Sequence, residues 1–209
     1  MKVVIPGLLL LVSSVFGQTR IDNVTATQVP FVNVERIGEA NARSFFVFST
    51  SSRSYTIRHD GHGEGSSLTT RRKNYDLRMN GALRIERLYF AEYDGDLVLE
   101  YEVTDGRGDW AYVLRMDQTM MRFKWVTPIS AEALGPGLID GRDLYISSVN
   151  VLAKIDMQTG AIGWQQSDFE HVSMFGLPTI KVDSVLFQDD FDSRRRIEID
   201  KQTGQFRKP

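Results

Sequence analysis

The sequence predicts an all-β protein built from repeated antiparallel units. One pattern, Asp-x-x-Thr-Gly-x-x-x-Trp, is complete between Asp156 and Trp164 and recurs in weaker form on both sides. The aspartates that open the three copies are Asp117, Asp156 and Asp200, which lie 39 and 44 positions apart. A period of about 40 residues in β-rich sequence is typical of the sheets of a β-propeller.

Each residue of the pattern has a structural reason. Gly160 and Gly204 stand where the chain must reverse with positive φ, which glycine tolerates at little cost. Asp156 and Thr159 can hydrogen-bond the backbone of such a turn. Trp164 is large, flat and amphipathic, so we expect it to fill the wedge between two twisted sheets. These residues are therefore interpreted as scaffold rather than as ligand contacts.

Apolar alternation and turn residues predict four successive four-stranded units, at residues 28–75, 83–127, 135–166 and 174–208. The dipeptides that separate strands are Asp94-Gly95, Asp105-Gly106 and Asp140-Gly141. The predicted strands of the first two units are Val29–Ile37, Phe45–Ser49, Tyr55–His59, Leu68–Lys73, Leu83–Tyr93, Asp96–Thr104, Ala111–Met116 and Arg122–Thr127. Those of the last two are Gly137–Ile139, Asp143–Ser148, Val151–Ile155, Ala161–Gln165, Pro178–Val182, Val185–Phe187, Arg195–Ile199 and Gln205–Arg207.

One predicted strand has a clear two-residue alternation. In Asp96–Thr104 two sets of residues interleave, namely Leu97, Leu99, Tyr101 and Val103 on one face and Val98, Glu100, Glu102 and Thr104 on the other. Such a pattern is typical of a half-buried strand with one polar face in solvent.

The repeats resemble those of pyrroloquinoline-quinone (PQQ) type β-propellers. The resemblance is close at residues 140–164, moderate at 94–125 and 183–208, and poor before residue 94. It implies a propeller-like architecture and points to the non-enzymatic branch of that family. The quinone enzymes of the family are far longer and place a pair of adjacent cysteines against the cofactor, whereas this chain has no cysteine. We therefore expect no redox cofactor.

The N-terminus and the composition indicate export. Residues 1–17 combine Lys2, a short apolar stretch and a small-residue cleavage site before Gln18, which is typical of a secretory signal. The remaining residues, 18–209, are predicted to form a single domain in the periplasm or outside the cell, with no lipoprotein cysteine. Without Lys2 the chain carries 24 basic residues (25 less 1) against 27 acidic ones, which gives no reason to expect nucleic acid as partner.

Two clusters of possible metal ligands have simpler explanations. His59, Asp60, His62 and Glu64 offer donors for a transition metal, but a Gly-rich loop does not hold two imidazoles on one face. Asp60 also stands where the later repeats have their turn aspartate, so we interpret the segment as a degenerate turn. The acidic run 189–192 lacks the spacing of a calcium loop and precedes three arginines that can pair with it.

No catalytic set emerges from the sequence. His171 lies in a predicted loop without a placed acid, and the Arg107-Gly108-Asp109 tripeptide is explained by hairpin turn chemistry. We therefore predict no catalytic, cofactor-binding or metal-binding residues, and expect an exported non-catalytic module that binds a protein or peptide or acts as a scaffold. The alternative is a small secreted hydrolase or oxidoreductase with a site built from loops of several units. A homodimer is expected only if the four units form an open arc, and a compact monomer is preferred.

Overall fold

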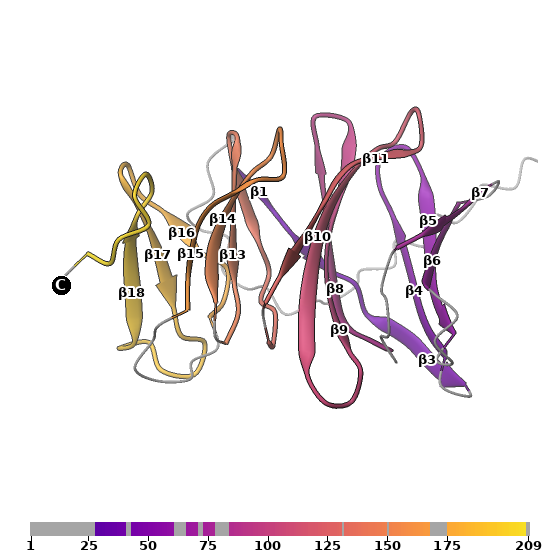
Figure 1. Cartoon of the computed structure of the whole chain (residues 1–209), viewed down its shortest axis with the longest axis horizontal. Helices are drawn as coiled ribbons and strands as arrows, with labels where there is room; N and C mark the ends of the chain where they lie inside the picture. The colour runs from indigo at the N-terminus through magenta and orange to yellow at the C-terminus, as the bar shows by residue number, and fades with distance from the viewer. Residues whose placement is uncertain are drawn as a thin grey trace, which may run out of the picture.

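The computed structural model describes residues 28–40, 43–60, 66–70, 73–77, 84–130, 132–149, 151–167 and 175–207. At positions 38–40, 43–45, 59–60, 66–67, 69–70 and 73–76 it describes the backbone alone. Every regular element in these residues is a β-strand, and the strands form four antiparallel sheets (Figure 1). The all-β prediction is confirmed.

The first two sheets have five strands each. The first sheet follows chain order, with strands β3 (Arg36–Ala40), β4 (Arg43–Ser49), β5 (Ser54–Asp60), β6 (Ser66–Thr70) and β7 (Lys73–Asp76). The second sheet has the order β11 (Arg122–Ile129), β10 (Asp109–Asp117), β9 (Asp96–Thr104), β8 (Arg84–Tyr93) and β2 (Val32–Asn33). Its edge strand β2 therefore comes from a distant part of the chain.

The third sheet has five strands and the fourth has three. The third has the order β1 (Gln28–Pro30), β12 (Leu138–Asp140), β13 (Asp143–Ser147), β14 (Leu152–Asp156) and β15 (Ile162–Gln166). The fourth contains β16 (Thr179–Ile180), β17 (Ser184–Gln188) and β18 (Arg196–Asp200), and Phe206 adds a single bridge to Ile199. The prediction of four strands in every unit is therefore wrong, because β1, β2 and β7 are additional and the last predicted strand is reduced to one bridge.

Residues 28–35, which we call the N-terminal strap, cross from the third sheet to the second and lead into the first. β1 pairs with β12 and β2 pairs with β8. The apolar residue between them, Phe31, is buried between the second and third sheets, while Val34 is buried between the first and second. The prediction of one strand at 29–37 is wrong because these two side chains anchor the segment in different inter-sheet gaps.

The four sheets lie in a row, with the first sheet and the fourth at opposite ends (Figure 1). Three clusters of buried apolar side chains fill the gaps between neighbouring sheets. Fully buried members are Leu99 in the first cluster, Ile146 in the second and Phe187 in the third. Packing between sheets therefore supplies the core.

The strand β9 is buried on both faces, so the prediction of a half-buried strand is wrong. All nine of its residues are buried, including Glu100 and Glu102. The reason is that the third sheet covers the face that the alternation left for solvent, and backbone N–H groups of that sheet's leading loop bind the two carboxylates. Alternation alone cannot reveal such a partner, because the loop lies more than thirty positions further along the chain.

The three pattern turns follow β10, β14 and β18. The Oδ1 atom of Asp156 accepts hydrogen bonds from the backbone N–H groups of Gln158 and Thr159, at 2.9 and 2.8 Å. Asp200 binds the two corresponding N–H groups at 3.0 and 2.9 Å, and Asp117 does so at 2.8 Å each. Gly160 and Gly204 have φ values of 74° and 72°. The predicted turn chemistry is therefore present, as a local consequence of side-chain to backbone bonding.

The tryptophan of each repeat packs on the glycine of the next repeat's turn. A Cβ atom on Gly160 would lie 2.7 Å from the Trp125 ring, and one on Gly204 would lie 2.6 Å from Trp164. The two indoles also donate hydrogen bonds to equivalent carbonyls, Trp125 to Met157 at 3.1 Å and Trp164 to Lys201 at 3.0 Å. The two tryptophans therefore occupy equivalent positions in successive repeats.

The first pattern turn differs at its glycine position. Met121 stands there with a φ of 54°, an uncommon conformation for a residue with a side chain. Its side chain is buried in the cluster between the first and second sheets. Where the other turns receive a tryptophan from the preceding sheet, this turn fills the gap with its own methionine.

Candidate functional site

A pocket lies between the first and second sheets, where the N-terminal strap leaves β8. We call it the β8 pocket, and it has a volume of about 450 Å³. The residues that line it are Asn33, Val34, Glu35, Arg36, Phe46, Glu86, Arg87 and Tyr89. They come from three separate segments, namely the strap with the start of β3, the strand β4, and β8.

Apolar side chains and one backbone bond hold the pocket in place. The N–H of Val34 donates to the carbonyl of Leu88 at 2.9 Å, which extends the pairing of β2 with β8 by one position. Val34, Phe46 and Tyr89 are all buried. The walls are therefore set by the packing of the sheets.

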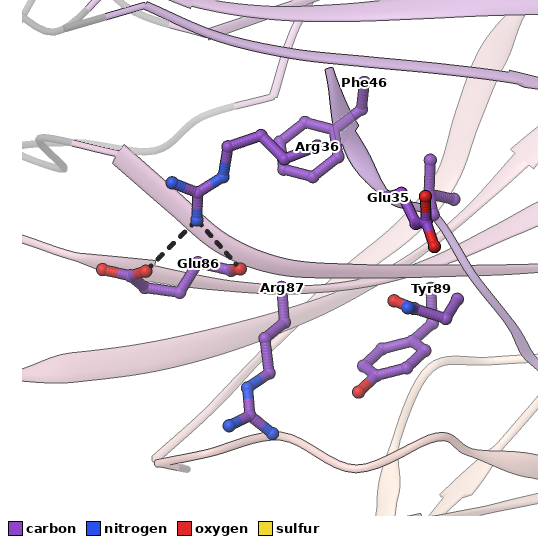
Figure 2. A pocket seen from close by; sticks show the side chains of 8 residues that line it. Glu35, Arg36, Phe46, Glu86, Arg87 and Tyr89 are labelled. Atoms are coloured by element: carbon purple, nitrogen blue, oxygen red, sulfur yellow. Dashed lines mark hydrogen bonds and ion pairs between the residues drawn. The ribbon is translucent and has the colours of Figure 1, made fainter. Parts of the chain in front are cut away.

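An ion pair forms one side of the pocket. Nη2 of Arg36 lies 3.3 Å from both the carboxylate and the backbone carbonyl of Glu86, and Figure 2 shows the guanidinium turned toward these two oxygens. Arg84 also pairs with the Glu86 carboxylate. The bulge in β8 between Ile85 and Arg87 places Glu86 in this position.

A second guanidinium is directed away from the pocket, toward the third sheet. Arg87 donates to the carbonyl of Leu134 at 2.9 Å and lies 3.4 Å from the carboxylate of Glu102. The hydroxyl of Tyr89 donates to the same Leu134 carbonyl at 3.1 Å. Figure 2 shows both side chains extending away from Arg36. Arg87 and Tyr89 therefore connect β8 to the loop that leads into the third sheet.

Two buried carboxylates of β9 bind the backbone of the same loop. Glu102 accepts hydrogen bonds from the N–H groups of Ala133 and Leu134, at 3.0 and 2.8 Å. Glu100 accepts one from Gly137 at 2.9 Å, and its Oε1 atom has no hydrogen-bond partner among the described residues. Burial raises the pKa of Glu100 well above its ordinary value and raises that of Glu102 as well.

These carboxylates predict a pH dependence of stability. Because the folded pKa of Glu100 exceeds its ordinary value of 4.5, the folded state binds more protons than the unfolded chain between these two values. This contribution is complete below about pH 4.5 and is lost as the pH rises through the folded pKa. We expect the unfolding free energy to fall as the pH rises above about 5, and to fall less in Glu100→Gln. Urea denaturation at several pH values measures both curves.

The two curves are compared only above about pH 5. Below that pH other carboxylates lower the unfolding free energy as the pH falls, which is opposite to the effect of Glu100. Desolvation acts to raise the pKa of Asp156, but hydrogen bonds from Arg142 and Thr159 outweigh it and lower this pKa to about 2. That contribution is present above the ordinary pKa and is lost as the pH falls. Parallel curves for the wild-type protein and Glu100→Gln would show that Glu100 does not carry the effect.

Two polar side chains of the β8 pocket are open to solvent. Asn33 and Glu35 are exposed, and within the described part of the chain neither side chain has a hydrogen bond or an ion pair. Arg36 is balanced by Glu86 and Arg87 by Glu102. Among the described residues, Glu35 is therefore the one charged residue of the lining without an ion pair, although the two acidic and two basic residues of the lining balance in total.

The structure places the residues considered at the sequence level away from this pocket or outside the described residues. His59 and Asp60 end β5, where the backbone alone is described, and His62, Glu64 and His171 lie outside the described residues. Asp60 is the last residue of β5. Asp156 and the other turn aspartates are likewise the last residues of their strands. Among the described side chains no group of three His, Cys, Asp or Glu residues gathers to hold a metal.

The acidic run forms a turn. Asp189 accepts hydrogen bonds from the N–H groups of Phe191 and Asp192, at 2.8 and 3.3 Å. Asp192 pairs with Arg194 at 3.1 Å and with Arg195 at 3.9 Å. These contacts account for the run by turn formation and local ion pairs, which agrees with its interpretation from the sequence.

The Arg107-Gly108-Asp109 segment lies at the hairpin between β9 and β10. Asp105 binds the N–H groups of Arg107 and Gly108 at 2.8 and 3.0 Å. Hairpin chemistry therefore explains this tripeptide, as expected.

The sequence analysis did not find the residues of the β8 pocket. The interpretation of 29–37 as one strand hid the bend that exposes Asn33 and Glu35. The only sequence signals are the polar pair Glu35-Arg36 after Val34 and the polar pair Glu86-Arg87 before the apolar stretch Leu88–Ala91. Neither signal is specific.

A comparison with protein-family models finds no match, and a search of curated proteins finds none either. The resemblance to PQQ-type repeats therefore stays a prediction. The described residues contain no helix with the length and apolar character that crossing a membrane requires.

Proposed function

We propose that this chain is an exported, non-catalytic module that binds an extended segment of another protein in the β8 pocket. Recognition of this kind uses a preformed groove with apolar walls and a few free polar groups that fix the ligand. The β8 pocket combines Val34 and Phe46, which pack between the first and second sheets, with the free side chains of Asn33 and Glu35. Beside it, β2 is the edge strand of its sheet, so its outer backbone groups can pair with an added strand.

One observation carries the proposal. The arginines of the pocket are already bound to Glu86, to Glu102 and to the Leu134 carbonyl. A general acid or base needs a titratable group within reach of a substrate, and a nucleophile needs an activating base. The lining offers the free side chains of Asn33 and Glu35 but none of the nucleophiles Ser, Thr, Cys and Lys, which suits binding better than nucleophilic catalysis.

The row of four sheets supports a propeller-type arrangement as part of this proposal. The repeated contact of a tryptophan with the next turn gives successive sheets similar junctions. We further propose that residues 1–17 are a signal that directs the chain to the periplasm or the exterior, with Gln18 as the mature N-terminus.

We favour a monomer over a homodimer that joins the ends of the row. The last sheet carries two partly exposed ion pairs, Lys181 with Glu198 at 2.5 Å and Arg207 with Asp200 at 2.7 Å, and its exposed apolar side chains Val182 and Phe191 lie in the loops, with Phe206 at the single bridge to Ile199. A stable interface between copies usually needs a more apolar surface.

A blocked pocket tests the function. In Asn33→Trp, a bulky side chain enters the pocket from an exposed position, so we expect peptide binding to weaken at least about tenfold while the fold is kept. The probes are peptides selected on the wild-type protein from a random twelve-residue phage library. Titration of the labelled peptides gives the dissociation constants.

The matched control is Val47→Trp. Val47 lies on β4 next to the lining residue Phe46, is 49% exposed and does not line the pocket. It should bind the selected peptides as the wild-type protein does. A library that yields no binder, or binders that ignore Asn33→Trp, would contradict the proposed function.

A further inference from the structure

We propose that the open edge of β16, in the fourth sheet, is a second binding site, where an extended apolar segment of another protein adds a strand. This site is separate from the β8 pocket, which is lined by residues of the strap, β3, β4 and β8. The strap already occupies the equivalent edge of the third sheet.

Three of the four sheets have this edge covered. We call β4, β8, β12 and β16 the leading strands of the four sheets. Residues 28–40 supply the covering strand each time, since β3 pairs with β4, β2 with β8 and β1 with β12. In the fourth sheet β16 stands at the end of the strand order, and no strand in the described part of the chain pairs with its other side. Among the described residues, the fourth sheet therefore lacks the strand that the other three have.

The third and fourth sheets repeat closely at their leading strands. Ile139 of β12 and Ile180 of β16 pair with equivalent positions of the strand that follows, with an offset of 41 (180 less 139). Gly135 and Gly176, which are also 41 positions apart, each donate their N–H to a carbonyl of that following strand, at 2.8 and 3.2 Å. The edge that the strap covers on β12 is therefore the edge that is open on β16.

The backbone of β16 is oriented to accept such a strand. Within the hairpin, Lys181 donates its N–H to the Ser184 carbonyl at 2.9 Å. Because bonded and non-bonded pairs alternate along an antiparallel ladder, the N–H and C=O of Ile180 point to the open edge. Its equivalent in the third sheet, Ile139, pairs with Val29 of the strap. Both backbone groups of Ile180 are therefore placed to bind an added strand.

Pro178, which stands just before β16, is compatible with this pairing. It is buried and, as a proline, has no N–H. Its equivalent in the third sheet, Gly137, directs its N–H to Glu100 at 2.9 Å and not to the strap. That donor plays no part in the pairing of the strap with β12, so its absence in the fourth sheet costs an added strand no hydrogen bond.

Apolar surface at this edge defines the chemistry of the occupant. Ile139 is fully buried, with Val29 of the strap opposite it. Ile180 packs against the cluster between the third and fourth sheets but is only half-buried, and Val182 is 90% exposed. Apolar side chains at alternate positions of an added strand would cover this surface, as Val29 and Phe31 do at the cluster between the second and third sheets.

The described residues of the strap cannot supply this strand. They are already paired, 28–30 with β12 and 32–33 with β8. Two copies that joined their β16 edges would share the bonds of a two-residue strand, which is little for a stable dimer. The occupant that we propose is therefore a segment of another protein, and the experiment tests residues 18–27 and a second copy as the alternatives.

The probe is a synthetic peptide that copies residues 26–35, because this sequence contains the strand that covers the equivalent edge. We expect it to change the backbone amide chemical shifts of residues 179–182, with a dissociation constant below about 1 mM. A peptide that is N-methylated at the copy of Val29 lacks the N–H that faces Ile180, and it should bind at least about tenfold more weakly. N-methylation at the copy of Val32, which lies beyond the paired stretch, should change little.

Two variants make the same test on the protein. Ile180→Pro removes the N–H that points to the open edge and spares the bonds within the sheet, so it should weaken peptide binding at least about tenfold. The matched control is Phe191→Ala, which removes a side chain that is 84% exposed in the loop between β17 and β18. It should leave the dissociation constant unchanged.

The outcomes separate this site from the β8 pocket. The library peptides test the pocket, and Asn33→Trp should leave the binding of the strap peptide unchanged. Shift changes at β8 or β12 would mean that the peptide replaces the strap, and would overturn the proposal. No shift change at about 1 mM peptide, or equal binding of the two N-methylated peptides, would overturn it as well.

Two further measurements test the other occupants. Tighter peptide binding after deletion of residues 18–27 would show that this chain covers the edge itself. A dimer in sedimentation that Ile180→Pro abolishes would show that a second copy does so. Either result would contradict a segment of another protein as the occupant.

Discussion

The Trp164→Ala variant should lose about 3–5 kcal/mol of unfolding free energy, the usual cost of truncating a buried large aromatic residue. Trp164 is 7% exposed and belongs to the cluster that joins the third and fourth sheets. Its ring lies 6.1 Å from that of Tyr145, and its indole N–H binds the Lys201 carbonyl at 3.0 Å. The fourth sheet has three strands, so it depends strongly on this junction. Chemical denaturation followed by circular dichroism measures the loss.

The comparison variants for this prediction are His59→Ala and His62→Ala. His59 lies near the end of β5, and His62 lies in the turn that the sequence predicts after it, so each substitution should cost far less than Trp164→Ala. The loss of unfolding free energy in Trp125→Ala should lie between the losses in the histidine variants and in Trp164→Ala, because Trp125 is half-buried. A larger loss in either histidine variant than in Trp164→Ala would show that the assignment of core and turn is wrong.

Gly160→Ala should cost about 2–5 kcal/mol, for two separate reasons. An alanine at a φ of 74° adopts the left-handed region, which costs about 1–2 kcal/mol. Its Cβ would also lie 2.7 Å from the Trp125 ring, and relieving such overpacking costs about 1–3 kcal/mol more. The same denaturation experiment gives the total.

Gly141→Ala separates the two reasons. Gly141 has a φ of 60°, and a Cβ there meets no heavy atom within 4 Å. Its substitution should therefore cost only the backbone strain, about 1–2 kcal/mol. In a Trp125→Ala background the cost of Gly160→Ala should fall toward the same value. Equal losses for Gly160→Ala and Gly141→Ala in the native background would mean that the tryptophan does not constrain the turn.

The turns could be predicted from the sequence because their cause is local. Asp156 binds N–H groups two and three residues further on, and Gly160 needs only its own positive φ. Such chemistry leaves a readable pattern in a short segment. The all-β fold with antiparallel strands followed from the same signals.

The strap and the burial of β9 could not be predicted, because their causes lie far along the chain. Val34 binds Leu88, and Glu102 binds Leu134. No local pattern records that a later loop covers the polar face of a strand. The β8 pocket has the same origin, since Asn33 and Tyr89 come together only through the pairing of β2 with β8.

The central claim is that the β8 pocket is where this chain binds a partner. The most direct measurement is the change in backbone amide chemical shifts when a selected peptide is added to the labelled protein. The largest changes should fall at residues 33–36 and 86–89, with smaller ones in β2. Changes concentrated in the fourth sheet, or at the hairpin between β9 and β10, would contradict the claim.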